Sequence, residues 1–166
     1  MENQTYLQLL KNAFHILFEK YNYKIVHHVA SDPFWNAQTF LQSDQLLLQI
    51  VNDWCQISLD LKSYDTNKPL KKQFNDFYDF GLVLEFLEIP EKKNLEALYE
   101  KVLTDMFSED SEWYNVIEKE SGVIQMNLIA EIFERNYEKI LDIFTVESIF
   151  ETKTKLASIR KERAKS

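Results

Sequence analysis

The stretch of sequence that decides the fold is LLLQIVNDWCQISLDL, residues 46–61. Residues 45–51 are apolar at nearly every position, which is typical of a central strand covered on both faces. Residues 54–61 instead alternate between apolar and polar side chains, which predicts a half-buried strand with one wet face. The polar pair Asn52-Asp53 predicts a short turn, so we expect an antiparallel hairpin. The side chains expected to face inward are Cys55, Ile57, Leu59 and Leu61.

Two segments upstream extend this hairpin into a meander. Residues 23–29 are rich in β-branched and aromatic residues, and residues 36–42 show a weaker strand pattern beyond a Ser-Asp-Pro break at 31–33. Ahead of them, residues 4–21 place apolar side chains at steps of three and four, which predicts an amphipathic helix. This helix is the nearest cover for the apolar side of the sheet. In the first strand, the residues expected to share one face are Tyr23, Ile25, His27 and Val29.

The second half of the chain predicts helices. After a polar loop, apolar residues recur at helical spacing over residues 76–89 and 91–107, with Asp76 placed to cap the first of these helices. Gly122 is expected to end a third helix. Residues 123–144 then predict a long fourth helix.

Strands followed by helices indicate an α+β fold. We expect an N-terminal helix, an antiparallel three- to four-stranded β-meander and a helical C-terminal half packed on it. Because a short meander must bury its apolar face, we favour one domain over residues 1–150 rather than a separate helical bundle. Residues 1–62 would hold the helix and the meander, and residues 76–150 the helical half. Residues 151–166 are interpreted as a basic C-terminal tail.

Composition and charge limit the partners of this domain. The 166 residues are 45% hydrophobic and include 12 Phe, 8 Tyr and 3 Trp, enough for a substantial core. The net charge is −8, but the tail has six basic and two acidic residues, so the first 150 residues carry −12. This balance argues against general nucleic-acid binding and favours a basic protein partner. The tail itself is expected to be a solvated or frayed helix end.

The sequence predicts a cytoplasmic protein. Its single cysteine, Cys55, cannot form an internal disulfide, which fits a reducing compartment. The first residues lack the basic and apolar regions of a secretory signal. No apolar run approaches the roughly 18 residues of a membrane span.

Few residues offer recognisable chemistry, and we expect no cofactor and no metal. Two glycines, Gly81 and Gly122, cannot build a phosphate-binding loop, and Gly81 instead indicates a close packing contact. His27 and His28 are adjacent on a strand and point to opposite faces, so they do not easily share a metal. Cys55 is predicted to be a buried structural thiol.

The one enzymatic alternative concerns Asp60 and Lys62 on the wet face of their strand. An acid, one spacer and a lysine resemble the second half of the metal-dependent nuclease signature of the restriction-endonuclease-like fold. In that signature the carboxylate holds a divalent metal and the lysine faces the same phosphate. The earlier acid of the family would fall to Asp44 or Asp53, but neither follows a proline and both lie in predicted turns. A solvated strand face explains the same pair.

Aromatic residues beside acids suit a protein-contact surface. Trp54 follows an acid at the predicted hairpin tip, and further acids gather between residues 65 and 91. Inward-facing tryptophans and a solvated acidic face would account for the same pattern. The candidate partner-binding residues are Asp53, Trp54, Asp60, Asp65, Asp76 and Asp79.

The central stretch, residues 46–61, preceded by a Phe-rich helix ending in Tyr21-Asn22-Tyr23, resembles small bacterial immunity proteins of contact-dependent and polymorphic toxin systems. The resemblance covers residues 6–90. Immunity proteins of this class are small, acidic, cytoplasmic and noncatalytic. They bind a cognate toxin domain, often a basic nuclease, and block its active site, and they share no functional motif that would assign a residue here.

The leading hypothesis is therefore a noncatalytic protein-binding module, an immunity-type inhibitor that captures and occludes a basic toxin domain. A second hypothesis is a scaffold or assembly protein that pairs with a copy of itself, as a homodimer for example, through the apolar helical content of residues 123–150. The nuclease built on Asp60 and Lys62 is the third.

Overall fold

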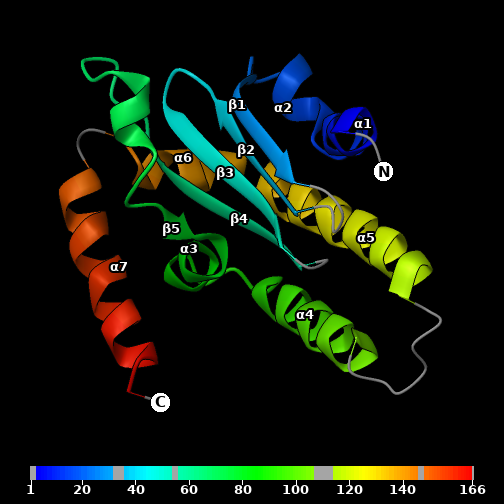
Figure 1. Ribbon diagram of the computed structural model, residues 1–166. Coiled ribbons are helices and arrows are strands. Elements are labelled where there is room, and N and C mark those ends of the chain that lie inside the picture. Colours follow the sequence, from blue (N-terminus) through cyan, green and yellow to red (C-terminus); the bar gives the residue numbers. More distant parts are fainter. Residues whose placement is uncertain (1–2, 32–35, 54–55, 107–113, 146–147, 166) are drawn as a thin grey trace.

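The computed structural model describes residues 3–31, 36–53, 56–106, 114–145 and 148–165 (Figure 1). Helices flank one antiparallel sheet, so the predicted α+β fold is confirmed. The helices are α1 (Asn3–Ala13), α2 (His15–Glu19), α3 (Phe80–Phe86), α4 (Lys92–Met106), α5 (Tyr114–Arg135), α6 (Tyr137–Ile143) and α7 (Ile149–Arg163), with a short 3-10 helix η1 (Leu70–Gln73). The strands are β1 (Lys24–Ser31), β2 (Asn36–Gln42), β3 (Leu46–Asp53), β4 (Gln56–Ser63) and β5 (Tyr78–Asp79).

The strands lie in the sheet in chain order, β1-β2-β3-β4-β5, and every neighbouring pair is antiparallel. The predicted meander is therefore confirmed, and the hairpin of the central stretch places Ile50 opposite Leu59. Strand β5 adds to the prediction, because helix was expected at residues 78–79. A strand of two residues is too short to show the alternation by which strands are recognised.

A β-bulge changes the faces of β1. The register shifts between Ile25 and His27, so that Ile25 pairs with Leu41 on the core side while His27 pairs with Phe40 on the other side. The prediction that Ile25, His27 and Val29 share a face is therefore wrong. One inserted residue moves every following side chain to the opposite face, and nothing in the local sequence marks it.

The hydrophobic core lies between one face of the sheet and helices α1, α5 and α6. In Figure 1, α5 and α6 pass behind the sheet and α1 lies next to β1. Helix α1 covers the sheet as predicted and buries Tyr6 and Leu10. Helices α5 and α6 add Ile129, Phe133 and Ile140, each fully buried. The helical half thus shares one core with the meander.

The first helix of the C-terminal half begins later than predicted. Asp79, not Asp76, caps α3, because Oδ1 of Asp79 accepts the backbone N–H of Leu82 at 2.9 Å. Asp76 instead adopts a left-handed backbone with φ 58°, which short polar residues tolerate. The expected close contact at Gly81 is present: a Cβ there would lie 3.1 Å from Oδ1 of Asp79. Glycine at this position therefore makes room for the cap.

Three other helix boundaries differ from the prediction. Helix α5 continues through Gly122, which was expected to end a helix. The predicted helix over residues 123–144 breaks at Asn136, whose side-chain amide donates to the carbonyl of Ile132 at 2.9 Å. The predicted N-terminal helix breaks at Phe14 into α1 and α2. None of the described helices combines the length and apolarity needed to cross a membrane.

Side chains close the outer edge of β4 where the short strand β5 does not reach. The backbone N–H of Ile57 donates to Oε1 of the fully buried Gln125 on α5 at 2.9 Å. The hydroxyl of Tyr99 on α4 donates to the carbonyl of the same Ile57 at 2.8 Å. An open strand edge is a template for unwanted pairing, and these two bonds remove it.

The basic tail is part of the folded body. Helix α7 begins at Ile149, and its Thr152 and Leu156 side chains are buried, packing mainly against α3. Most of its side chains are exposed, as expected of a solvated helix end, but the docking through Thr152 and Leu156 was not predicted. A stripe formed by Thr152, Leu156 and Ile159 lies on one side of the helix, but basic residues around it hide the pattern in the sequence.

Candidate protein-binding surface

The face of the sheet away from the core is only partly covered. At one end, the loop after β4 folds over it, and Phe40 stacks on Phe74 with ring centroids 4.1 Å apart. Beyond this aromatic cover lie half-buried or exposed side chains from four strands, among them Val29, which is 50% exposed. We call this surface the open strip: Val29, Gln38, Gln49, Val51, Ser58 and Asp60.

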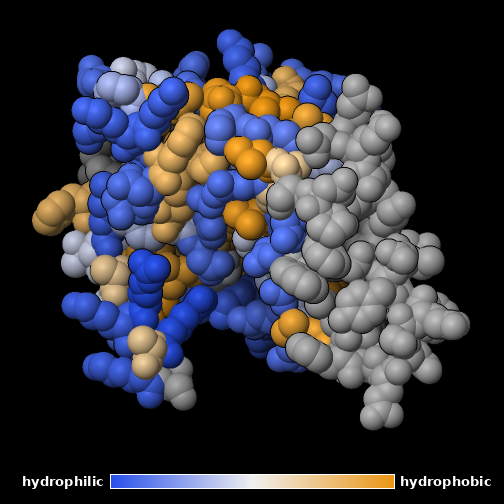
Figure 2. Space-filling model, viewed as in Figure 1, coloured by the Kyte–Doolittle hydropathy of each residue, from blue (hydrophilic) through white to orange (hydrophobic). Residues whose placement is uncertain are grey.

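Hydrophobic and hydrophilic side chains alternate over the open strip. The register sets Val29, Gln38, Val51 and Ser58 in one row across the sheet. Figure 2, viewed from the same side as Figure 1, shows hydrophobic and hydrophilic residues side by side over this part of the molecule. Mixed polar and apolar composition of this kind is typical of non-obligate protein interfaces.

Asp60 is the charged member of the open strip. It lies directly opposite Asp79 across the β4–β5 pairing, so two carboxyl groups are cross-strand neighbours. Partial burial, and then the charge of Asp79, raise the pKa of Asp60 to about 6. Among the described residues, none forms an ion pair or hydrogen bond with the Asp60 carboxyl group. A cationic group from outside would relieve this repulsion.

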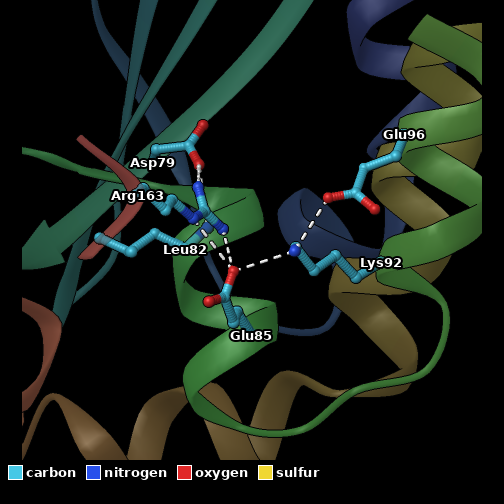
Figure 3. Close-up of polar contacts among 6 residues, drawn as sticks. All are labelled: Asp79, Leu82, Glu85, Lys92, Glu96 and Arg163. Carbon is cyan, nitrogen blue, oxygen red and sulfur yellow. Dashed lines mark hydrogen bonds and ion pairs between the residues drawn. The ribbon is translucent and has the colours of Figure 1, made fainter. Parts of the chain in front are cut away.

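Asp79 and Glu85 belong to a network of ion pairs that joins β5, α3, α4 and α7 (Figure 3). Nη1 of Arg163 lies 3.6 Å from Oδ1 of Asp79, and Nε of Arg163 donates to Oε2 of Glu85 at 3.0 Å. Nζ of Lys92 lies 2.9 Å from the same Glu85 oxygen and 2.9 Å from Oε1 of Glu96. The hydrogen bonds from Arg163 and then Lys92 hold the pKa of Glu85 below its usual range.

The other predicted contact residues are dispersed. Asp53 is the exposed last residue of β3, at the hairpin end of the sheet, and Trp54 lies outside the described residues. Asp76 is exposed in the loop before β5. Asp65 shapes the loop after β4, since its carboxylate accepts the N–H of Asn67 and pairs with Lys68. These contacts, the Asn67 N–H first, lower the pKa of Asp65.

The structure therefore brings together Asp60 and Asp79 and leaves the other predicted contacts apart. It adds Glu85, Lys92 and Arg163, of which Arg163 belongs to the tail that was expected to be solvated. The one available signal was the i, i+4, i+7 spacing of Thr152, Leu156 and Ile159. A hollow of about 140 Å³ lies where β5, α3 and α7 meet. Its lining residues are Phe77, Tyr78, Asp79, Leu82, Arg160 and Arg163.

The geometry around Asp60 and Lys62 does not favour a phosphate site. Nζ of Lys62 donates to the carbonyl of Asn75 at 2.7 Å and lies 5.5 Å from the centroid of Phe77. The Lys62 ammonium group thus already has interaction partners within the protein. In the described part of the chain, no three His, Cys, Asp or Glu side chains come together as metal ligands.

The two strand histidines face opposite sides of the sheet, as expected. His27 stacks on Phe74, with ring centroids 5.6 Å apart. Nδ1 of His28 lies 2.8 Å from Oγ1 of Thr39, on the core side. Burial, and then the charge of His27, lower the pKa of His28. Cys55 lies outside the described residues.

Comparisons of the chain with family models, with curated proteins and with solved structures find no match in any of the three.

Proposed function

We propose that the protein is a noncatalytic binding module that captures and occludes a basic partner, as an immunity-type inhibitor does with a toxin domain. The observation that carries the proposal is the carboxyl group of Asp60, which lies opposite Asp79 at the edge of the open strip and has no ion-pair or hydrogen-bond partner among the described residues. Natural proteins keep a repulsive pair of this kind where a ligand or partner supplies the missing charge. Val51, on the strand next to Asp60, and Val29, farther across the sheet on β1, provide apolar contact area.

The charge of the whole chain supports the same mechanism. The first 150 residues carry −12, which would steer a basic protein toward this surface and raise the association rate. Such steering weakens with salt, because the Debye length falls from about 10 Å at 0.1 M to about 3 Å at 1 M ionic strength. Once the partner is docked, the valine and glutamine side chains of the open strip would cover the partner's active site.

Self-association gains no support from the helices. The hypothesis of a scaffold rested on the apolar content of residues 123–150. Met126, Ile129 and Phe133, in that stretch, are buried in the protein's own core. Folding thus accounts for these three side chains, whereas Ile124 and Phe150 in the same stretch are 54% and 82% exposed and lie apart from the core.

The test is neutralisation of a toxin. Each basic toxin-like domain found encoded beside the gene of this protein is expressed with and without it, and we expect one of them to arrest growth alone and to permit growth when both are present. The purified pair should form a complex whose association rate falls with ionic strength. No recovery and no complex, or an association rate indifferent to salt, would count against the proposal.

A matched pair of variants locates the surface. Asp60→Asn removes one charge from the open strip, and Glu134→Gln removes one from an exposed position on α5, on the opposite side of the sheet. We expect Asp60→Asn to slow association about two- to fivefold and Glu134→Gln to change it far less. Equal effects would show that only net charge matters and that the open strip is not the contact.

A further inference from the structure

Helix α7 is a basic helix packed on an acidic surface of its own chain. It carries five basic and two acidic residues. Arg163 forms ion pairs with Asp79 and Glu85 (Figure 3). Nζ of Lys155 lies 6.0 Å from the ring centroid of Phe86. We call the surface that α7 covers the α7 seat: Asp79, Leu82, Glu85 and Phe86. Its charge is the complement of the helix that covers it.

The attachment of α7 is narrow. The helix packs mainly against α3 and lies at the side of the molecule in Figure 1. Of its described side chains, Thr152 and Leu156 are buried, while Phe150 is 82% exposed. A helix held by one stripe and a few ion pairs is the kind of unit that opens while the rest of a protein stays folded.

The α7 seat adjoins the open strip. Asp79 is opposite Asp60 on the sheet and is also a partner of Arg163. When Arg163 leaves, both carboxyl groups lack a counter-charge, and a basic side chain from outside can pair with either. A partner docked on the open strip therefore reaches the seat without crossing other elements.

We infer that the α7 seat is a second part of the partner-binding surface and that it accepts a basic amphipathic helix of the partner. In the free protein α7 occupies the seat, and the partner's helix displaces α7 on binding. This rests on the proposed function and names the chemistry of its partner. Binding of an amphipathic helix to a complementary groove is a common mode of recognition. The tethered α7 competes at a high effective concentration, so it lowers the affinity for weak or incorrect partners.

The first test needs no partner and uses hydrogen exchange in the full-length protein. We expect the amides of α7 to be protected at least about tenfold less than those of α5, because α7 opens separately. Arg163→Glu should lower α7 protection further, about tenfold, and leave α5 unchanged. Lys161→Glu is the matched control, since Lys161 is exposed and two positions from Arg163 along the helix. If α7 exchanges only with global unfolding, the inference fails.

The second test uses a fluorescent peptide that copies residues 149–163, titrated into full-length protein. The variant that releases α7 carries Leu156→Asp and Arg163→Glu, and α5 protection verifies that its core is folded. We expect it to bind the peptide at least about tenfold more tightly than the wild type, in which α7 competes. Arg163→Glu alone should give an intermediate affinity. Equal affinities, or no binding to either protein at about 1 mM peptide, would overturn the inference.

The seat itself is tested in the released protein. Glu85→Lys should abolish peptide binding, whereas Glu88→Lys, an exposed charge reversal nearby in the sequence, should preserve it.

The outcomes separate a failure of this inference from a failure of the proposed function. If the toxin domain is neutralised while α7 protection stays unchanged in the complex, α7 is not displaced and the inference alone is wrong. If α7 opens and the peptide binds but no toxin is neutralised, the proposed function is wrong.

Discussion

Replacing Asp60 by asparagine should stabilise the protein at high pH. Partial burial and the charge of Asp79 raise the pKa of Asp60 from 3.8 to about 6 in the folded state. A raised carboxyl pKa means that the folded protein holds the proton more tightly than the unfolded chain, so stability is lost as pH rises from about 4 to above 6. The asparagine side chain would keep the shape of the aspartate without its charge, and so the variant would avoid this loss.

The pKa shift of Asp60 sets the expected gain in stability of the Asp60→Asn variant. A difference of about two pKa units corresponds to about 3 kcal/mol, which is an upper bound. Asp60 is partly exposed, so solvent screening reduces the gain to about 1–2 kcal/mol. Urea unfolding of wild type and Asp60→Asn at pH 8 and at pH 4 measures it as a difference in midpoint at constant slope. We expect the stabilisation at pH 8 and almost none at pH 4.

A comparison acid gives the opposite sign. Asp65 has a lowered pKa because the Asn67 N–H and Lys68 stabilise its charge, so Asp65→Asn should destabilise the protein at pH 8. If Asp60→Asn proves less stable than wild type at pH 8, or is stabilised equally at both pH values, the charge of Asp60 is compensated in the folded protein. The open strip would then hold no unpaired charge for a basic partner to meet.

Three further predictions concern the strand edge and the glycines. Gln125→Leu leaves the N–H of Ile57 unpaired inside the protein and should lower stability by about 1–3 kcal/mol, measured by urea unfolding. Tyr99→Phe removes the bond to the carbonyl of the same residue, with an expected loss of about 0.5–1.5 kcal/mol in that assay. Gly122→Ala should raise the thermal midpoint, with a gain of about 0.5–1 kcal/mol, because a Cβ there meets no atom of the described residues within 4 Å. Gly81→Ala should lower the midpoint through the contact with Asp79. If the Gly81 variant is as stable as the wild type, the Asp79 cap contributes little.

The sheet could be predicted because its information is local. Alternation over residues 54–61 and the apolar run before it specify strands. The position of the turn between them was predicted wrongly, because Asn52 and Asp53 belong to β3 and pair with Ile57 and Gln56 of β4. The bulge after Ile25 and the strand of residues 78–79 could not be predicted in this way. Both depend on which residues lie across the pairing, and this becomes visible only when the chain is folded.

Residues of the binding surface could be predicted from the sequence only where a local pattern marks them. Asp60 was a candidate because it lies on the polar side of an alternating strand. Arg163 was not, because its partners Asp79 and Glu85 are about 80 residues away in the sequence. Long-range ion pairs carry no periodic signal, so only the stripe of Thr152 and Leu156 pointed to a docked helix.

The acidic residues of this chain differ in whether another group of the protein forms a hydrogen bond or an ion pair with them. Asp65 has partners in its own loop, and Asp79 has partners in the helix it caps and in Arg163. Asp60 has no such partner among the described residues, and its charge opposes folding at neutral pH. Stability alone would favour a neutral residue at that position. A residue that weakens the fold and lies beside an open, partly apolar strip is best explained by a contact that forms only when a basic partner binds.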